Sequence, residues 1–230
     1  MTDGGQSDGD DDGVEWRGGI VPVSRRYGDP YYSLGGGLAE SRLVFLGGNG
    51  LPDRLRDGFR IAELGFGTGL NMLATLIAWH ATGRPGTLRY TAFEAHPLPA
   101  GAIARALSAF PEAEAVAGPF LGPWARGAMR FAPGGMEVEV VAGDARATLP
   151  AWDGCADAWF LDGFAPARNP AMWEDALMAQ VGAHTVPGGT FATYTAAGHV
   201  RRALEAAGFD VDRRPGFGTK RHRTAGVRRA

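Results

Sequence analysis

The sequence predicts an α/β fold built on a mostly parallel β-sheet. A short apolar run at residues 59–62 is followed by a glycine-rich stretch at residues 63–71, and a helical pattern of apolar residues begins at Leu70. Beyond this turn, strand-like and helix-like segments alternate along the chain. Parallel strands need such crossover connections, because a tight turn can join only antiparallel strands. We therefore expect a single α/β domain over residues 15–230.

The other elements are predicted from apolar periodicity and from breaks at Gly and Pro. Short extended segments are expected from residue 16 to residue 37, and helices at residues 38–46, 98–110, 170–186 and 199–207. Strands are expected at residues 88–93, 156–161, 190–194, 211–214 and 225–228. Residues 129–132 and 136–141 should form a hairpin, whereas Pro and Gly interrupt residues 118–127. The last two strands should form an antiparallel pair on an otherwise parallel sheet.

Composition limits the class of protein. A length of 230 residues suits one domain with a substantial core. Residues 1–14 are acidic and contain almost nothing to bury, so we expect a disordered tail there. The net charge of −2 hides an arginine-rich carboxyl end. Cys155 is the only cysteine and the five histidines lack ligand spacing, so no metal site is expected. With neither a signal-peptide pattern nor a membrane-spanning apolar run, we expect a cytoplasmic protein.

The stretch at residues 63–71 predicts a strand, a tight turn and the start of a helix. Its glycines let a ligand approach the backbone at a helix N-terminus. Leu70 stands where a dinucleotide fingerprint needs its third glycine, and Glu63 would repel a pyrophosphate but can face a cationic methionine group. The pattern therefore favours S-adenosyl-L-methionine over NAD; a purely structural turn is the alternative. The predicted cofactor-binding residues of this stretch are Glu63, Gly65, Phe66, Gly67, Thr68, Gly69 and Asn71.

Two further acidic residues at strand ends are predicted to bind this cofactor. Glu94 closes the strand at residues 88–93, where it can accept hydrogen bonds from both ribose hydroxyl groups. Asp144, followed by Ala145, ends the predicted hairpin and suits the exocyclic amine of adenine. The alternatives are a solvated carboxylate for Glu94 and a helix N-cap for Asp144.

Asp162 directly follows the buried strand at residues 156–161 and is the best candidate for catalysis. Ligands of such sheets bind beyond the carboxyl ends of the strands, so Asp162 should lie beside the methyl donor. Methyl transfer to nitrogen needs a neutral amine aimed at the methyl carbon. A carboxylate here could hold a protonated amine, accept its proton and orient it for attack. We therefore predict that Asp162 is both catalytic and cofactor-binding.

Several unusual stretches are shared with one enzyme family. They are PVS at 22–24, YYS at 31–33, LVFLGGN at 43–49, the glycine turn, DAWFLDGFAPARNP at 157–170 and RPGFG at 214–218. On these stretches, and over about residues 22 to 227, the chain resembles the methyltransferase domain of the bifunctional bacterial enzymes that make 5-methylaminomethyl-2-thiouridine at the tRNA wobble position.

The resemblance implies a class I S-adenosyl-L-methionine-dependent methyltransferase fold. This fold is Rossmann-like, with a mostly parallel seven-stranded sheet and an antiparallel terminal strand, here with an N-terminal extended segment and an inserted hairpin. The implied reaction is N-methylation of the 5-aminomethyl group of uridine or 2-thiouridine at the wobble position. The implied substrate-binding residues are Phe164, which would stack on the base, Tyr32 on an aromatic lid, and Arg168, Lys220 and Arg221, which would hold phosphates of the anticodon loop.

The chain departs from the family pattern at two places. Arg168 stands where the family usually carries Lys, and Lys220-Arg221-His222 stands where it usually reads Lys-Arg-Glu. Family members often carry a flavin-dependent oxidase domain after the methyltransferase, so we expect tRNA and a separate flavin oxidase as partners. Core packing of Phe164 and a solvated arginine face remain open. So do two other functions: a small-amine N-methyltransferase and a non-catalytic tRNA-binding module.

Overall fold

The structure, a computed structural model, describes residues 13–33, 36–83 and 86–230. The predicted acidic tail lies outside the described residues except for Gly13 and Val14. Val14 is buried and begins β1 (Val14–Arg17), which pairs antiparallel with β2 (Val21–Ser24). The first strand therefore begins one residue before the predicted domain boundary at residue 15.

The main sheet has eight strands within the described part of the chain, in the order β5-β6-β4-β3-β7-β8-β10-β9. Their bounds in this order are Arg130–Phe131, Met136–Ala142, Leu88–Glu94, Arg60–Leu64, Ala156–Leu161, Thr185–Thr193, His222–Arg228 and Phe209–Pro215. The five strands from β6 to β8 are parallel, whereas β10 pairs antiparallel with both β8 and β9. The prediction of a mostly parallel sheet with an antiparallel end is confirmed.

The predicted hairpin is present but is not an insertion. β5 and β6 pair antiparallel, and β6 also pairs in parallel with β4 over its full length. β6 is thus a regular member of the parallel sheet, and only the two-residue β5 is additional. This additional edge strand explains why the sheet has eight strands and not the predicted seven.

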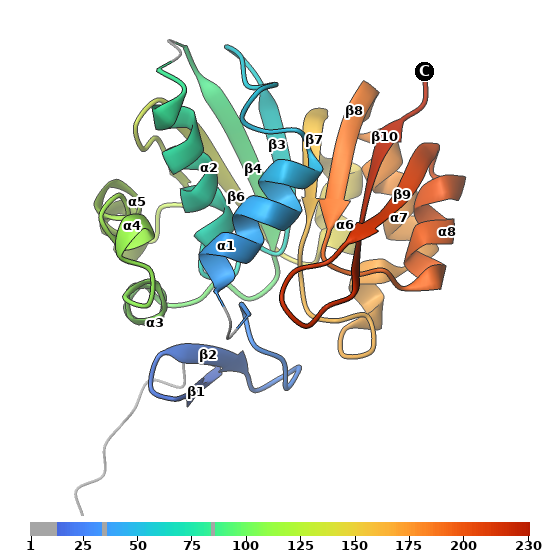
Figure 1. Ribbon diagram of the computed structural model, residues 1–230. Helices are drawn as coiled ribbons and strands as arrows, with labels where there is room; N and C mark the ends of the chain where they lie inside the picture. Colours follow the sequence, from blue (N-terminus) through green and yellow to red (C-terminus); the bar gives the residue numbers. More distant parts are fainter. Residues whose placement is uncertain (1–12, 34–35, 84–85) are drawn as a thin grey trace, which may run out of the picture.

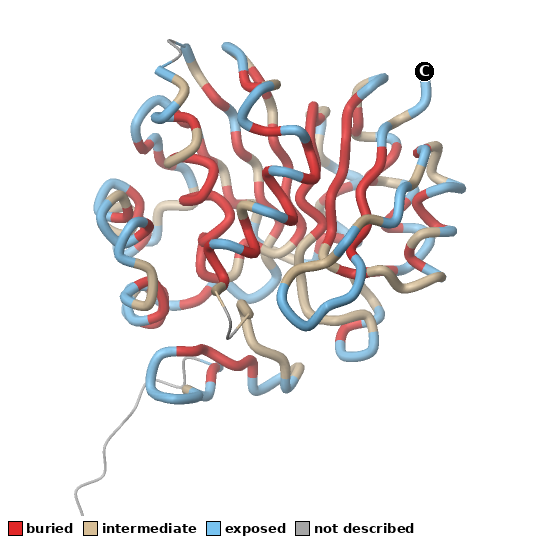
Figure 2. The backbone as a smooth tube through the Cα atoms, in the orientation of Figure 1, coloured by how far each residue is buried: buried red, intermediate tan, exposed pale blue. Residues whose placement is uncertain are grey.

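Helices cover both faces of the sheet, as Figure 1 shows. One layer contains α1 (Gly37–Ser41) with its π-helical continuation η1 (Arg42–Leu46), α2 (Leu70–Ala81), α3 (Ala100–Leu107), α4 (Pro111–Glu114) and α5 (Gly118–Ala125). The other contains α6 (Ala145–Thr148) with η2 (Leu149–Ala151), and α7 (Asp175–Ala183), preceded by η3 (Pro170–Trp173), packed against α8 (Gly198–Ala206). The strands form the buried centre of the molecule (Figure 2).

The two apolar cores follow from strand alternation. Successive side chains of a strand point to opposite faces of a sheet. In β7, Ala158 and Phe160 join the core beneath α1 and α2, whereas Trp159 and Leu161 join the core beneath α7 and α8. Because both faces are covered, β7 is buried along its whole length. β7 ends at Leu161, so the next residue, Asp162, lies at the carboxyl ends of the parallel strands.

Two predicted segments are wrong in detail. Residues 118–127 were expected to be interrupted but contain α5, in which Phe120 and Trp124 lie four residues apart and both face the core. The helix expected over residues 170–186 ends at Ala183, and β8 begins at Thr185 and continues through the Pro-Gly-Gly that was expected to separate them. A register shift in the pairing of β7 with β8 accommodates this irregular sequence.

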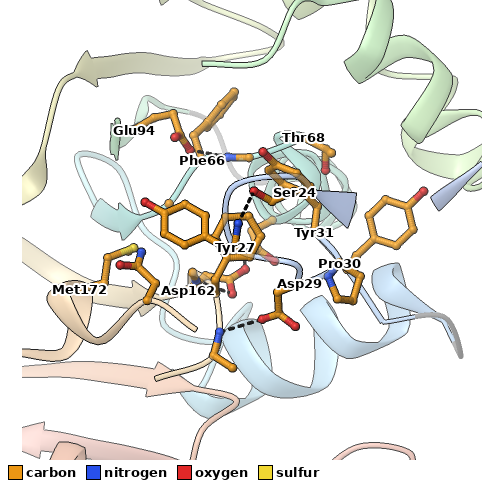
Figure 3. Close-up of a pocket in the computed structure, with 18 of the residues that line it drawn as sticks. Ser24, Tyr27, Asp29, Pro30, Tyr31, Phe66, Thr68, Glu94, Asp162 and Met172 are labelled. Carbon is orange, nitrogen blue, oxygen red and sulfur yellow. Dashed lines mark hydrogen bonds between the residues drawn. The ribbon is translucent and has the colours of Figure 1, made fainter. Parts of the chain in front are cut away.

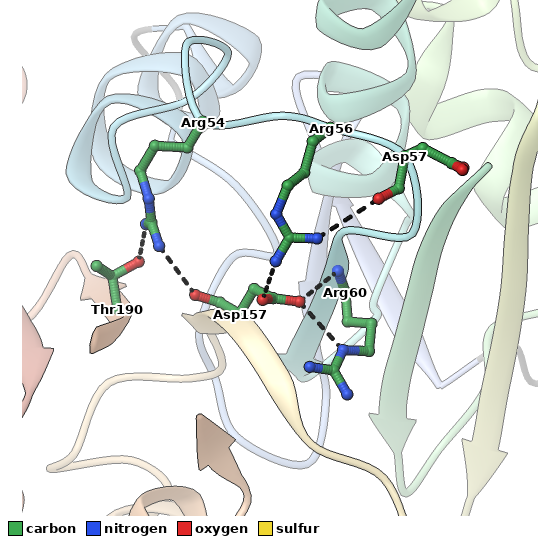
Figure 4. Close-up of polar contacts among 6 residues, drawn as sticks. All are labelled: Arg54, Arg56, Asp57, Arg60, Asp157 and Thr190. Atoms are coloured by element: carbon green, nitrogen blue, oxygen red, sulfur yellow. Dashed lines mark hydrogen bonds and ion pairs between the residues drawn. The ribbon is translucent and has the colours of Figure 1, made fainter. Parts of the chain in front are cut away.

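Asp157 has a structural position at the end of β7 opposite Asp162. Its buried carboxylate accepts hydrogen bonds from Arg56 Nη2 at 2.7 Å and from the amide and Nε of Arg60 at 2.9 and 3.1 Å (Figure 4). Arg54 bridges the carbonyl oxygen of Asp157 to the hydroxyl of Thr190. These contacts link the amino ends of β3 and β7 to the middle of β8.

Candidate active site

A cavity of about 1320 Å³ lies at the carboxyl ends of the parallel strands. Its walls come from the glycine turn after β3, the residues that follow β4, β6 and β7, the segment after β2 and the start of α1. Figure 3 shows side chains from the segment after β2, the glycine turn and the carboxyl ends of β4 and β7 gathered in one place. Ligand pockets usually measure about 300 to 1000 Å³, so this cavity has room for a nucleoside cofactor and part of a second ligand.

The glycine turn has the backbone that only glycine adopts readily. Gly65, Gly67 and Gly69 have φ values of 85°, 53° and 73°. A Cβ on Gly65 would lie 3.0 Å from the carbonyl oxygen of Asp162, and one on Gly67 would lie 3.1 Å from the Tyr31 ring. The backbone conformation and the close contacts therefore explain why glycine is needed at these positions. The same turn also borders the cavity through Gly65, Gly67 and Thr68.

The other residues of the turn differ in whether their side chains face the cavity or the core. Asn71, at the start of α2, lines the cavity. Gly69 is the N-terminal cap residue of that helix. Phe66 borders the cavity, but only 3% of its surface is exposed and its ring stacks on Trp124, with 5.2 Å between the centroids. The Phe66 side chain therefore belongs mainly to the core.

Glu94 is held in place by the glycine turn itself. Its Oε2 accepts a hydrogen bond from the Gly67 amide at 2.9 Å, and its Oε1 accepts one from the His96 amide at 2.8 Å. A carboxylate has about four acceptor positions, so both oxygens can still accept from a ligand. This geometry suits a pair of neighbouring hydroxyl groups.

Beneath the cavity, Asn71 connects two carboxyl groups. Its Nδ2 donates to Glu63 Oε1 and to Asp162 Oδ2, both at 2.8 Å. Glu63 is fully buried, accepts a second hydrogen bond from Tyr90 at 2.9 Å and does not line the cavity. Burial first, and then the nearby charge of Asp162, raises the pKa of Glu63 well above its usual value. Any contribution of Glu63 to ligand binding must therefore act through Asn71.

Asp162 lies on the cavity wall with its carboxylate held on both sides. Oδ1 accepts from the Gly163 amide at 2.8 Å, and Oδ2 accepts from Asn71. Burial raises the pKa of Asp162 from 3.8 to about 6, although these two hydrogen bonds oppose the increase. A carboxylate with this pKa is mostly ionised at pH 7 and still basic enough to take a proton from a bound cation.

Asp144 and Ala145 line the cavity at the start of α6. Asp144 Oδ1 accepts from the Arg146 amide at 2.9 Å, so this residue is an N-cap, the alternative that its sequence position left open. Hydrogen bonding to Arg146, first through the side chain and then through the backbone, holds the pKa of Asp144 below its usual value. The Arg146 guanidinium also donates to both carboxylate oxygens, so an amino group in the cavity would have to share these acceptors with Arg146.

The five predicted substrate residues separate into two groups. Tyr32, Phe164 and Lys220 line the cavity, whereas Arg168 and Arg221 are exposed and are not among its lining residues. The hydroxyl of Tyr32 donates to the carbonyl oxygen of Ile20 at 2.8 Å, and burial raises the pKa of Tyr32 to about 12. Tyr32 therefore anchors the N-terminal segment. The two arginines could reach only a ligand that extends beyond the cavity.

Phe164 lies in an aromatic wall. Its ring centroid is 4.7 Å from that of Tyr27 and 5.0 Å from that of Tyr31, which packs edge-on. Asp29 fixes the same loop by accepting a hydrogen bond from the Ala165 amide at 2.8 Å (Figure 3). The segment after β2 thus closes over the loop that carries Asp162.

Sequence reasoning missed several lining residues, among them Tyr27, Asp29, Glu40, Met172 and Tyr194. Tyr194 directly follows β8, as Asp162 follows β7, so its position at the carboxyl edge was a signal that could have found it. Glu40 gave a second signal, because it is an acidic residue within the mostly apolar helical stretch at residues 38–46, and the structure buries it.

The described residues contain no group of three or more His, Cys, Asp or Glu placed to hold a metal ion. Within the same ranges, no helix combines the length and apolarity needed to cross a membrane.

The cavity fits S-adenosyl-L-methionine. Its wall carries the carboxylates of Glu94, Asp144 and Asp162, which suit a cofactor that has hydroxyl groups, an amino group and a positive charge. The family model described as S-adenosyl-L-methionine-dependent methyltransferase matches residues 111–229. The chain belongs to this family of methyltransferases, and the predicted cofactor and fold class are confirmed.

Named relatives are similar in sequence to this chain over most of its length. It is 49% identical over 216 residues to the tRNA 5-methylaminomethyl-2-thiouridine biosynthesis bifunctional protein MnmC of Caulobacter vibrioides, an alignment that covers 90% of this chain and 36% of that protein. The protein of the same name from Leptospira borgpetersenii is 41% identical, with 93% and 34% coverage. The chain therefore spans about a third of the length of these relatives.

The fold is also found in a solved structure. The crystal structure of MnmC2 from Aquifex aeolicus superposes with a TM-score of 0.73 and 24% identity, covering 90% of this chain and 66% of that one. This likeness supports the architecture described above.

Proposed function

We propose that the protein transfers a methyl group from S-adenosyl-L-methionine to the primary amine of a 5-aminomethyl group on uridine or 2-thiouridine at the tRNA wobble position. The product is 5-methylaminomethyl(-2-thio)uridine. The names of the relatives support the substrate. The position of Asp162, ionisable near neutral pH on the wall of a cavity that can hold two ligands, carries the chemistry.

Asp162 has two tasks in this reaction. An alkyl amine is largely protonated at neutral pH, so the carboxylate first attracts the ammonium group. It then accepts one proton, which leaves the nitrogen lone pair free. Asn71 and the Gly163 amide hold the carboxylate in a fixed direction throughout. When bound, S-adenosyl-L-methionine supplies a methyl group on a positively charged sulfur, and displacement by the amine nitrogen leaves a neutral thioether.

The remaining cavity residues position the two ligands. Glu94 accepts hydrogen bonds from the ribose, and Asp144 from the adenine amine. Tyr27, Tyr31 and Phe164 form the aromatic wall against which an unstacked base can pack, as single-stranded RNA readers use aromatic side chains. Positioning of this kind supplies much of the rate of a bimolecular displacement.

Outside the cavity, the exposed residues Arg168 and Arg221 are placed to contact phosphates of the anticodon stem and loop. The 5-aminomethyl group arises from a carboxymethylaminomethyl group by an oxidation, and the relatives are named as bifunctional proteins. We therefore assign this step to a flavin oxidase activity other than the methyltransferase domain described here.

Nucleoside mass spectrometry tests the proposal. Purified protein and S-adenosyl-L-methionine are incubated with tRNA that carries the 5-aminomethyl group, and the RNA is digested. A mass increase of one methyl group on that nucleoside supports the proposal. Methylation of small primary amines but not of this tRNA would favour a small-amine methyltransferase. Tight tRNA binding without any transfer would favour a non-catalytic module.

A further inference from the structure

Lys220 differs from the other basic residues of the carboxyl end because it turns into the cavity. It lies in the loop between β9 and β10 and lines the cavity, whereas its neighbour Arg221 does not. Its Nζ lies 2.7 Å from Glu40 Oε1, and the two residues are 180 positions apart in the sequence. The side chain of Glu40 is only 10% exposed and that of Lys220 is 42% exposed. A residue whose only task is to hold outer phosphates needs no buried partner.

The ammonium group of Lys220 is fixed close to the reaction centre. Nζ lies 4.2 Å from the centroid of the Tyr194 ring, a distance at which a cation is attracted to the ring face. The Tyr194 hydroxyl in turn donates to the carbonyl oxygen of Gly163 at 2.7 Å, next to Asp162. The charges of Glu40 and Lys220 are also near enough to affect the pKa of Asp162.

The ammonium retains donor capacity for a ligand. A lysine ammonium has three N–H donors and no acceptor. One donor is used by Glu40. The remaining donors can bond only to an acceptor atom. Because the side chain is partly exposed, a ligand in the cavity can reach them.

The chemistry of the substrate indicates which acceptor this is. The inference rests on the proposed function, in which the 5-aminomethyl nitrogen lies at Asp162. C4 of the pyrimidine ring is bonded to C5, so its substituent must lie beside the aminomethyl group and hence beside Asp162. In uracil this substituent is the acceptor O4, and in cytosine it is an amino donor.

We propose that Lys220 is a specificity-determining residue that donates a hydrogen bond to O4 of the target base, with Glu40 as its positioning residue. A uracil base then satisfies the donor. A cytosine base places two donors against each other, so the N–H groups of Lys220 that Glu40 does not use find no acceptor on the base, and a site built around a hydrogen bond discriminates against such a mismatch.

The test compares two anticodon stem–loop RNAs that carry either 5-aminomethyluridine or 5-aminomethylcytidine at the wobble position and are otherwise identical. The readouts are kcat/KM for methyl transfer and its dependence on salt concentration. We expect the wild type to prefer uridine by about 10- to 100-fold. Lys220→Met should lower kcat/KM for the uridine RNA by a similar factor, change the cytidine rate little and leave the salt slope as in the wild type.

Arg221→Met is the matched control in the same loop. A phosphate contact contributes a slope of about 0.7 to 0.9 per charge, so this variant should flatten the salt slope and preserve the ratio between the two RNAs. Glu40→Gln should reduce the ratio only in part. The double variant E40Q/K220M leaves no unpaired buried carboxylate and should resemble Lys220→Met, and its affinity for S-adenosyl-L-methionine reports an intact fold.

Three outcomes overturn the inference. A Lys220→Met variant with an unchanged uridine-to-cytidine ratio and a flatter salt slope would make Lys220 a phosphate contact. A wild type that methylates both RNAs equally would remove the specificity while the proposed function stands. Failure of the wild type to methylate either RNA would refute the proposed function itself.

Discussion

Replacement of Asp162 with Asn tests the reaction centre most directly. Asparagine has nearly the same shape and keeps one oxygen that can accept from Asn71 or from the Gly163 amide. It loses the negative charge and the ability to take up a proton. We expect near-normal affinity for S-adenosyl-L-methionine and a fall in kcat of roughly 10²-fold or more, the usual contribution of a positioned base.

The pH dependence of the wild type follows from the same carboxyl group. With the pKa of Asp162 raised by burial to about 6, roughly nine-tenths of the molecules carry the ionised form at pH 7 and roughly one-tenth at pH 5. The profile of kcat/KM reports groups of the free enzyme. It should therefore contain a step of about tenfold between pH 7 and pH 5 that is missing from Asp162→Asn.

The raised pKa also makes a prediction about stability. Because the folded state disfavours the ionised form, the contribution of this group is fully present below the ordinary pKa and is lost as the pH rises through about 6. A pKa raised from 3.8 to about 6 corresponds to a loss of at most about 3 kcal/mol above pH 6. Without cofactor, Asp162→Asn should therefore be more stable than the wild type by about 1–3 kcal/mol at pH 8, and the difference should shrink toward pH 5.

Three measurements check this reasoning. They are methyl transfer to tRNA carrying the primary amine at pH 5 to 8, titration calorimetry with the cofactor, and denaturant unfolding at pH 5 and pH 8. Wild-type turnover by Asp162→Asn at pH 7 would rule out Asp162 as the proton acceptor. Equal stabilities of the wild type and Asp162→Asn at pH 8 would show that the ionised carboxylate does not destabilise the folded state.

The remaining predictions concern the two ligands. Glu94→Ala should weaken binding of S-adenosyl-L-methionine by about 1–3 kcal/mol through loss of charge-assisted hydrogen bonds. Unchanged affinity in calorimetry would show that Glu94 does not bind the ribose. Charge reversal at Arg168 or Arg221 should raise KM for tRNA and flatten its salt dependence while cofactor affinity stays constant; if neither kinetic quantity changes, these residues form only a solvated face. tRNA with a carboxymethylaminomethyl group should not be methylated, because its nitrogen is secondary and its carboxylate would face the like charge of Asp162. Product formed from that tRNA by the purified chain, seen by nucleoside mass spectrometry, would contradict this.

Local sequence was sufficient to predict most strands of the parallel sheet and the residues at its carboxyl edge. The run from residue 59 through the three glycines specifies a strand, a left-handed turn and a helix within a dozen residues, and Glu94 ends one strand while Asp162 directly follows another. These features depend on backbone geometry and on strand alternation, which neighbouring residues determine. The same local logic failed at α5 and at the start of β8, where burial of Phe120 and Trp124 and a shift in strand register outweighed Pro and Gly.

Local sequence did not predict how deeply each side chain is buried relative to the cavity, or in which direction it points. Glu63 was expected at the cofactor and lies beneath Asn71, while Asp144 serves as an N-cap. Both residues are near the positions that sequence reasoning gave them. What differs is the direction of the carboxylate, which is set by Tyr90 in one case and by Arg146 in the other.

The fold and the cofactor class could therefore be predicted from the sequence, as could the position of Asp162 after the central strand β7. The side chains that surround Asp162, and the strength with which it binds a proton, depend on the tertiary structure. Glu40 and Lys220 meet across 180 residues, and the pKa of Asp162 depends first on burial by segments distant in the chain. Desolvation and charge act through space, whereas a sequence pattern records only neighbours along the chain.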